Sequence, residues 1–502
     1  MMPRNRNLVL LTIVLGVYFL FQILLIRNVT IAQYDESIYL DVARSIRNTG
    51  LPMRSVGQYG RFYFEHLPGY VYLIGGLTTL FGENITLLRL ITMLFGAGAI
   101  SLTAIIGWRA QDAAAGFVAA LLLALNGFFA TYAYFIREET FFVFFILLAC
   151  YFLLRLEETA NNRYLLATTL SIAVAMFLKE IALAFLLAAA IYQLFLYHTW
   201  RARLLAIFII ALPSLLVLIV WLLWANTLDP AQLQITLNRW LGAFNAEQQI
   251  VDPRIGLLPL AWMESIVNLL FGWELVLLFL FALIYTLFRR RRPPHIAYLL
   301  LLYTFIAFAA SFIMSLKESR HLVAILPTLC LLIGLLLPWS TWWYGISADR
   351  RRLIIATPLI LLFLLSASPL KLTTAYNPGS RWDTIYAGRL LHNDADLNLV
   401  KDAGDYLAAN APPGTLITVV RMGPVIGYYA KLPYIFLYTR PFAENMEILG
   451  ESSYVIIDSS NFWQQTPEET ETLMQYIVDN FTVDHLLQDQ SRQITIYRRK
   501  NS

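Results

Sequence analysis

The chain has 502 residues, of which 58% are hydrophobic and only 14% are charged. These fractions lie well outside the range of soluble globular proteins and indicate a protein with many membrane-spanning helices. The net charge of +4 is too small to argue for nucleic-acid binding. The two cysteines, Cys150 and Cys330, lie inside apolar segments, so packing explains them better than a disulfide or a metal site.

About eleven segments approach the roughly 20 apolar residues that a transmembrane helix requires. The predicted spans are 8–26, 86–108, 113–135, 140–154, 164–178, 181–197, 204–225, 266–288, 296–316, 322–338 and 353–370. The first follows two arginines and has no small-residue cleavage site, so we interpret it as an uncleaved signal anchor. Tyr70 to Phe81 is apolar but too short to cross, and we expect it to lie along the membrane surface or to re-enter it.

Arginines are concentrated in alternate loops, with runs at 289–292 and 350–352. The positive-inside rule therefore predicts a cytoplasmic N-terminus in the plasma (inner) membrane. The first outer loop, 27–85, also carries five arginines, but long loops obey the rule less strictly. An odd number of spans then places the C-terminal segment outside.

The composition changes sharply after the last predicted span. Strand-like runs appear at 415–420, 434–438, 454–457 and 494–497, and helical patterns at 397–409 and 467–480. We therefore predict a transmembrane domain over residues 1–370 and a small extracytoplasmic α/β domain over residues 371–502.

Four short charged clusters lie at span ends that this topology places on one face of the membrane. They are Tyr34-Asp35-Glu36, Arg137-Glu138-Glu139, Lys179-Glu180 and Lys317-Glu318-Ser319-Arg320-His321. Charge at a membrane boundary is costly unless it is solvated, paired with an opposite charge or part of a functional site. Each cluster has a local explanation as a helix start, an ion pair or a solvated turn. Their convergence on one face nevertheless suggests a polar site.

The first outer loop offers candidates for acid–base chemistry. Residues 36–48 have helical spacing, so Asp35 can act as the N-cap of a helix. The alternative is a general base held at the membrane surface. Further along, Glu65 and His66 follow an aromatic run typical of a lipid–water interface, and a histidine there could donate to a phosphate.

Several motifs are missing from the sequence. It has no phosphate-cradling glycine-rich loop, no HExxH motif, no CxxC pair and no GxSxG motif. The predicted spans also lack acidic residues near their middles, which a proton or ion relay would need.

Taken in order, the motifs resemble the C-class membrane glycosyltransferases, specifically the protein O-mannosyltransferase and aminoarabinose-transferase branch. The resemblance covers roughly residues 1–340 and rests on Asp35-Glu36, Glu65-His66-Leu67-Pro68, Leu88-Arg89-Leu90, the Ala/Leu-rich stretch 112–124, Arg137-Glu138-Glu139, Phe177-Leu178-Lys179-Glu180, and Lys317 to Leu322 followed by Pro327. The chain departs from the family where His66 replaces a common phosphate-binding lysine and where Glu138-Glu139 replaces Pro-Asp. Its C-terminal domain does not identify an acceptor.

The resemblance implies a polytopic α-helical enzyme that moves a sugar from a polyprenyl-phosphate donor to a hydroxyl on a lipid, glycan or protein. Transfer would occur on the outer face, usually with inversion. No metal-ligand cluster is evident in the sequence, so we expect transfer to need no metal or cofactor. The implied base is Asp35, with Glu36 as the next candidate. The candidates for binding the departing phosphate are His66, Arg137, Lys179 and Arg320, and Glu65, Glu138, Glu139 and Lys317 would support them.

Other functions remain open at this point. A flippase or transporter of lipid-linked glycans would need a polar path across the membrane, and neither such a path nor internal repeats are apparent. A non-catalytic envelope assembly protein or receptor would most simply lack the carboxylate of Asp35. Among enzymes, a polymerase or ligase of surface polysaccharide is the nearest competitor.

Overall fold

The computed structural model describes residues 4–25, 34–55, 60–240, 272–289, 292–313, 323–340, 395–420, 422–437, 442–458, 466–488 and 493–500. The chain forms two compact units, which we treat separately. The helical unit comprises Met1–Arg27, Phe64–Tyr70 and Arg89–Leu391, and the α/β unit comprises Asn28–Tyr63, Val71–Leu88 and His392–Ser502. The predicted domain boundary at residue 370 lies outside the described residues.

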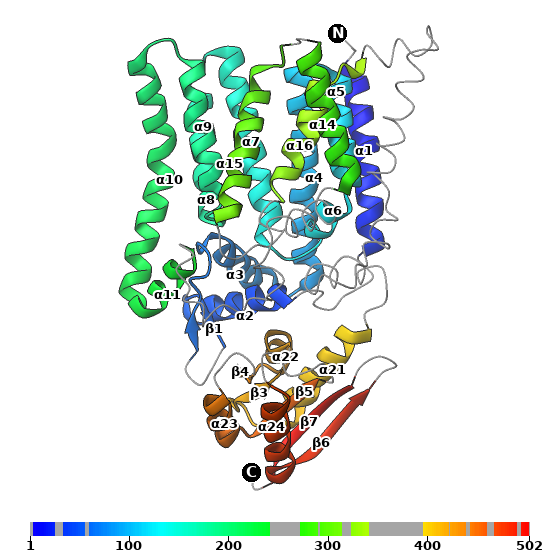
Figure 1. Cartoon of the computed structure of the whole chain (residues 1–502), viewed down its shortest axis with the longest axis vertical. Coiled ribbons are helices and arrows are strands. Elements are labelled where there is room, and N and C mark those ends of the chain that lie inside the picture. Colours follow the sequence, from blue (N-terminus) through cyan, green and yellow to red (C-terminus); the bar gives the residue numbers. More distant parts are fainter. Residues whose placement is uncertain are drawn as a thin grey trace. The chain divides into compact units, whose positions relative to one another are not determined.

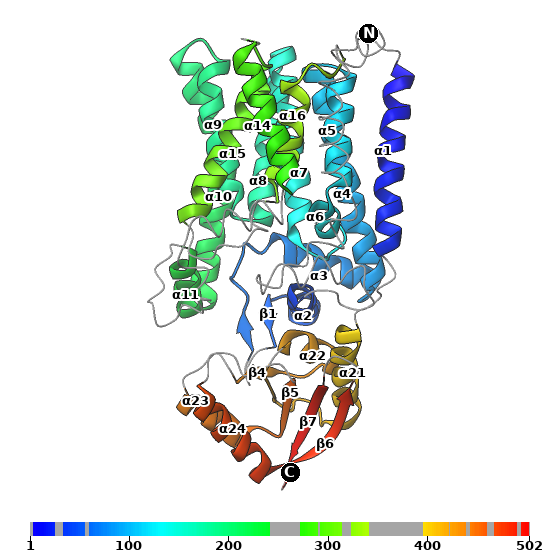
Figure 2. The ribbon, with the colours of Figure 1, turned by 45° about the vertical axis from the view of Figure 1, so that its right-hand side comes forward.

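The helical unit is a bundle in which most helices run side by side (Figures 1 and 2). Its helices are α1 (Arg4–Leu25), α4 (Ile85–Ala110, which begins just before this unit), α5 (Ala113–Leu125), α6 (Gly127–Tyr132), α7 (Glu138–Thr159), α8 (Asn162–Leu178), α9 (Ala182–Leu196), α10 (Trp200–Leu228), α11 (Pro230–Trp240), α14 (Gly272–Phe288), α15 (His295–Ile313) and α16 (Ile325–Leu336). By length and composition, α4, α7 and α10 can cross a membrane, and shorter apolar helices accompany them.

Helices occupy each predicted span from 8–26 to 322–338, whereas the span 353–370 lies outside the described residues. The count of about eleven spans therefore stays a prediction. One span differs from the expectation, because Asn126 divides the apolar run 113–135 into α5 and α6. Asn126 has extended backbone angles, and its side chain accepts a hydrogen bond of 2.8 Å from the backbone N–H of Phe129. It ends one helix and caps the next.

Small residues let α4, α5 and α16 approach closely. A Cβ added at Gly107 would lie 2.5 Å from Cα of Gly116, and one added at Gly334 would lie 2.5 Å from the carbonyl oxygen of Ala115. Neither position has room for a side chain. Close backbone contact of this kind is a common way for helices to associate within a membrane.

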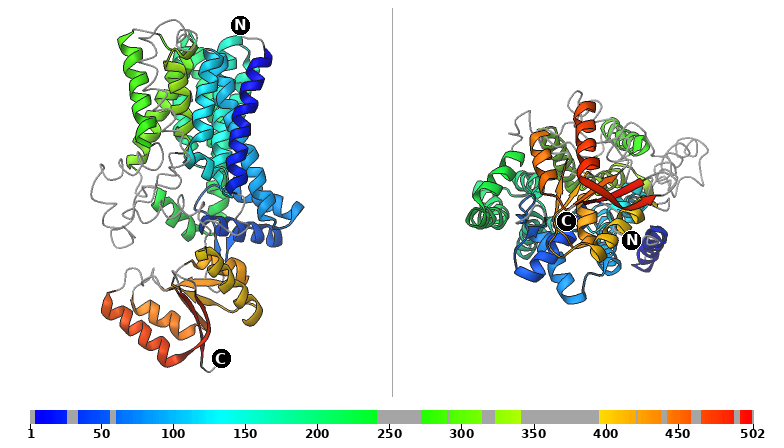
Figure 3. Two further views of the ribbon diagram at one scale, coloured as in Figure 1. Left: turned by 90° about the vertical axis from the view of Figure 1, so that its right-hand side faces the viewer. Right: turned by 90° about the horizontal axis from the view of Figure 1, so that it is seen from below.

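In the α/β unit, a five-stranded sheet has the order β4-β3-β5-β7-β6. Its strands are β3 (Ile417–Val419), β4 (Tyr434–Phe436), β5 (Tyr454–Asp458), β6 (Phe481–Gln488) and β7 (Gln493–Arg499). The first three are parallel, and β7 and β6 continue the sheet in antiparallel fashion. The helices α21 (Ala395–Asn410) and α22 (Gly423–Ala430) lie on one face of the sheet, and α23 (Phe442–Glu451) and α24 (Pro467–Asn480) on the other (Figure 3).

The strand runs and helical patterns expected from the sequence coincide with β3, β4, β5, β7, α21 and α24. The sequence reading missed β6, α22 and α23. A β-bulge between Val483 and His485 interrupts the alternation of β6, and glycine and proline open the short α22. Leu449 of α23 is nevertheless fully buried in the core beside Val455 of β5 and Leu473 of α24.

The α/β unit also contains α2 (Tyr34–Thr49), most of α3 (Gly69–Phe81), and the short antiparallel pair β1 (Met53–Arg54) and β2 (Arg61–Phe62). Arg44 of α2 donates to both carboxylate oxygens of Glu83, and its guanidinium lies 4.5 Å from the ring centre of Tyr428 in α22. The backbone of Tyr434 donates to that of Ser55 at 3.1 Å. These contacts fasten the first-loop helix to the C-terminal part of the chain.

Candidate functional site

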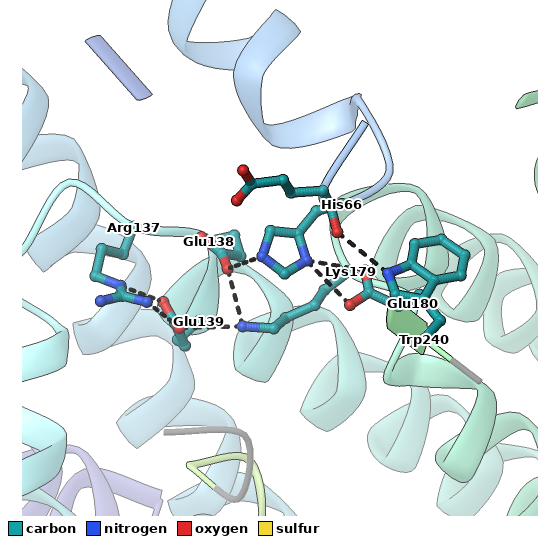
Figure 4. Close-up of polar contacts among 8 residues, drawn as sticks. His66, Arg137, Glu138, Glu139, Lys179, Glu180 and Trp240 are labelled. Atoms are coloured by element: carbon teal, nitrogen blue, oxygen red, sulfur yellow. Dashed lines mark hydrogen bonds and ion pairs between the residues drawn. The ribbon is translucent and has the colours of Figure 1, made fainter. Parts of the chain in front are cut away.

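One polar cluster in the helical unit joins three segments that are far apart in the sequence. His66 comes from the loop before α3, Arg137, Glu138 and Glu139 from the start of α7, and Lys179 and Glu180 from the connection between α8 and α9 (Figure 4). The start of α7, the end of α8 and the start of α9 lie at the same end of the bundle (Figure 1). We call these six residues the polar cluster.

Arg137 and Glu139 form a fully buried ion pair. Arg137 occupies the N-cap position of α7 but makes no side-chain cap hydrogen bond to it. Its Nε and Nη2 instead donate to the two oxygens of Glu139, at 3.0 and 2.9 Å, and the two side chains are 1% and 0% exposed. A cation at a helix N-terminus is unfavourable, so the glutamate in the first turn offsets that cost.

Lys179 ties the end of α8 to the start of α7. Its Nζ donates to Oε1 of Glu138 at 2.9 Å and to Oε1 of Glu139 at 3.0 Å. Burial lowers the pKa of Lys179, but the two glutamates more than offset this effect, and the net shift is upward. Lys179 is therefore a cation held between two carboxylates.

His66 links the first loop to the same network. Its Nδ1 lies 3.0 Å from Oε1 of Glu180, and its Nε2 lies 4.0 Å from Oε1 of Glu138. Burial lowers the pKa of His66, yet the charge and hydrogen bond of Glu180 outweigh this effect and raise it above the ordinary value of 6.5. For Glu180, burial raises the pKa, but His66 reverses the balance and lowers it. The pair thus favours imidazolium and carboxylate.

The charges of the polar cluster balance when His66 is protonated, because three glutamates face one arginine, one lysine and one histidine. One oxygen is an exception to the otherwise complete pairing of the glutamates. Oε2 of Glu138 is buried and has no hydrogen-bond partner within the described part of the chain. An unsatisfied buried carboxylate oxygen is costly and requires an explanation.

Aromatic side chains hold the segment that carries His66. Trp240 of α11 donates from Nε1 to the backbone carbonyl of Glu65 at 3.2 Å and stacks on Trp221 of α10, with the rings 5.1 Å apart (Figure 4). Phe64 makes an edge-to-face contact with Trp224. Indole rings from α10 and α11 thus anchor the loop beside the polar cluster.

The remaining candidate residues belong to the α/β unit or fall outside the described residues. The helix expected to begin after Asp35 starts at Tyr34, so the expectation that Asp35 is its N-cap was wrong. Asp35 and Glu36 are in the first turn of α2, in the α/β unit, where Asp35 is half-buried and Glu36 is fully buried. Lys317 and Arg320 lie outside the described residues. In the described ranges, no group of three or more histidine, cysteine, aspartate or glutamate residues could hold a metal ion.

Two buried polar residues were not among the candidate site residues, although Arg89 belongs to a motif that carries the family resemblance. Asp41 of α2 accepts from the backbone N–H and the hydroxyl of Ser55, at 2.7 and 2.8 Å, and burial raises the pKa of its carboxyl group. Arg89 of α4 donates to the hydroxyl of Tyr134 at 2.8 Å. The sequence signal for Arg89 was its position in an otherwise apolar helix; Asp41 lies in a mixed segment that gives no comparable signal.

Residues 65–224 match the family model of dolichyl-phosphate-mannose-protein mannosyltransferases. The expected family resemblance is confirmed. This matched segment contains all six residues of the polar cluster. Among curated proteins, no sequence matches the chain.

Solved structures show that the fold is shared with glycosyltransferases. ArnT from Cupriavidus metallidurans in the apo state has a TM-score of 0.63 and 15% identity, over 98% of each chain. The same enzyme bound to undecaprenyl phosphate has a TM-score of 0.60 and 16% identity, again over 98% of each chain. The oligosaccharyltransferase of Archaeoglobus fulgidus, in its apo form, has a TM-score of 0.60 and 13% identity, over 91% of this chain and 70% of the other.

Proposed function

We propose that this protein is a membrane glycosyltransferase that moves a sugar from a polyprenyl-phosphate donor to a hydroxyl acceptor on the outer face of the membrane. The single observation that carries the proposal is the polar cluster, which gathers His66, Arg137 and Lys179 at one end of the bundle, inside the segment matched by the family model. The similar structures of ArnT with undecaprenyl phosphate and of an archaeal oligosaccharyltransferase with dolichol phosphate support a lipid-phosphate donor.

The chemistry requires that the departing lipid phosphate be stabilised as the bond from C1 of the sugar breaks. Arg137 and Lys179 are permanent cations in a buried setting, where charge interactions are much stronger than in water. His66 adds a cation that depends on pH. The donor phosphate accepts hydrogen bonds from these groups, which also bind the glutamates. Arg320 contributes from the predicted outer loop 317–321.

In this mechanism, Asp35 acts as the base. The acceptor oxygen attacks C1, its proton passes to Asp35, and the lipid phosphate leaves with the electron pair of the broken bond, which inverts the configuration at C1. Asp35 is preferred to Glu36 because Asp35 is partly exposed whereas Glu36 is fully buried. The transfer requires no metal or cofactor.

The decisive experiment compares wild type with Asp35→Asn, because asparagine keeps the size of the side chain but is not basic. We expect sugar transfer to fall by about 10² to 10⁴ while binding of undecaprenyl phosphate is retained. Glu36→Gln is the matched control for loss of a neighbouring charge. Equal turnover of wild type and Asp35→Asn at saturating donor would remove Asp35 from the catalytic role. Movement of lipid-linked sugar without transfer would indicate a flippase instead.

A further inference from the structure

The two adjacent glutamates at the start of α7, Glu138 and Glu139, differ in how many of their oxygens accept hydrogen bonds. Both oxygens of Glu139 are occupied, since Oε1 accepts from Arg137 and Lys179 and Oε2 accepts from Arg137. In Glu138, Oε1 accepts from Lys179, whereas Oε2 has no hydrogen-bond partner among the described residues. Glu138 is only 1% exposed, so bulk water does not serve this oxygen.

The surroundings of Glu138 define which chemical group could form a hydrogen bond with its Oε2. Lys179 and His66 face its other oxygen, at 2.9 and 4.0 Å, and already provide the nearby positive charge. A carboxylate oxygen only accepts hydrogen bonds, so its missing partner must be a donor. A phosphate oxygen is excluded because it is itself an acceptor and carries negative charge. A hydroxyl group meets the requirement.

We infer that Oε2 of Glu138 binds a hydroxyl of the donor sugar and so makes Glu138 a specificity-determining residue. This inference rests on the proposed function, because the sugar is bonded directly to the phosphate that Lys179 and Arg137 receive. The sugar, which is joined to that phosphate, therefore lies next to Glu138, which also accepts a hydrogen bond from Lys179. A site built to bond a hydroxyl rejects an analogue that lacks it, since the buried oxygen is then left unpaired.

The test compares two ligands, undecaprenyl phosphate alone and the same lipid phosphate carrying a sugar, chosen from mannose, glucose and aminoarabinose as the one that wild type binds most tightly. Glu138→Gln keeps the size of the side chain and an oxygen for Lys179, but its amide nitrogen cannot accept. We expect it to weaken binding of the sugar-bearing lipid by about tenfold to a hundredfold, as for a lost hydrogen bond to a charged group, and to leave binding of the bare lipid phosphate intact or improved.

Glu139→Gln is the matched control, one residue away and equally buried. Because Glu139 holds Arg137 and Lys179, this change should alter the binding of both ligands by the same factor. If Glu138→Gln also changes both by one factor, or changes neither, the free oxygen is served by water and the inference is overturned. It is overturned as well if no sugar improves binding to wild type over the bare lipid phosphate.

A second measurement does not depend on the variant folding. Donors in which single sugar hydroxyls are replaced by hydrogen are bound to wild type, and one of them should lose affinity by the same tenfold to hundredfold. Equal affinity for every deoxy donor would exclude the contact. Failure of wild type to bind undecaprenyl phosphate at all would instead refute the proposed function, so the two failures are distinguishable.

Discussion

At the scale of single residues, the buried pair of Arg137 and Glu139 depends on both of its members. Removing one partner of a buried ion pair leaves an uncompensated charge and typically costs about 3–5 kcal/mol. We therefore expect Arg137→Met to lower the free energy of unfolding by about that amount. The double variant Arg137→Met/Glu139→Gln should recover part of the loss, because it restores the charge balance of the polar cluster, which Arg137→Met leaves with three glutamates and two cations. Denaturant unfolding of the purified proteins in detergent compares wild type, Arg137→Met, Glu139→Gln and the double variant. If the losses of unfolding free energy in the two single variants simply add up in the double variant, the pairing is contradicted.

The contact between His66 and Glu180 predicts how phosphate binding responds to pH. Glu180 raises the pKa of His66 above 6.5, so the cation, and the stability it contributes, persists fully below that pH and is lost as the pH rises through the raised pKa. Affinity for undecaprenyl phosphate should fall over the same upper window. In Glu180→Gln the midpoint should move to lower pH, and in His66→Lys the fall should disappear between about pH 6 and 8, because lysine titrates well above that range. Identical profiles for His66→Lys and wild type would rule out titration of His66 as the cause.

At the scale of helices, the break at Asn126 fixes how α6 leads into the polar cluster. The next residues run through Tyr132, over whose ring the guanidinium of Arg137 lies at 5.4 Å. Asn126→Ala removes a cap in a nearly buried site and should destabilise the protein by about 1–2 kcal/mol. Asn126→Asp keeps the acceptor oxygen and should cost less. Asn161 caps α8 in the same manner but is exposed, so Asn161→Ala should cost less still; equal losses at both sites, measured by thermal unfolding, would argue against a special role for the break.

The helices also show what could be predicted from the sequence and what could not. Hydrophobic length located most of them, because burial of apolar residues in the bilayer leaves a long continuous signal. The break at Asn126 was missed although Asn126-Gly127 is a turn signal, since the apolar run on both sides concealed it. The predicted topology indicated that the start of α7 and the end of α8 lie on one face. Which cation contacts which glutamate could not be read, because it depends on side-chain positions in segments brought together only by folding.

At the scale of the whole molecule, the topology is a prediction that the arginine asymmetry supports. Reporter fusions after Arg292 and after Ser502 should give a cytoplasmic and an extracytoplasmic signal, respectively. A fusion within the first outer loop, 27–85, provides the control, because the same topology places that loop outside. A cytoplasmic signal at Ser502 would place the C-terminal domain away from an external site and would break the assignment of Asp35 and the polar cluster to one face.

The short sequence distance between Arg137 and Glu139 has a consequence for biosynthesis. In the predicted topology, the hairpin that joins α6 to α7 must carry its charges across the hydrocarbon layer before most of the bundle exists, and each unpaired charge is costly there. A bidentate pair between residues two apart can form inside the nascent hairpin itself. The hairpin can therefore cross with its arginine already neutralised. Glu138 gains its partner only later, because Lys179 is synthesised after it.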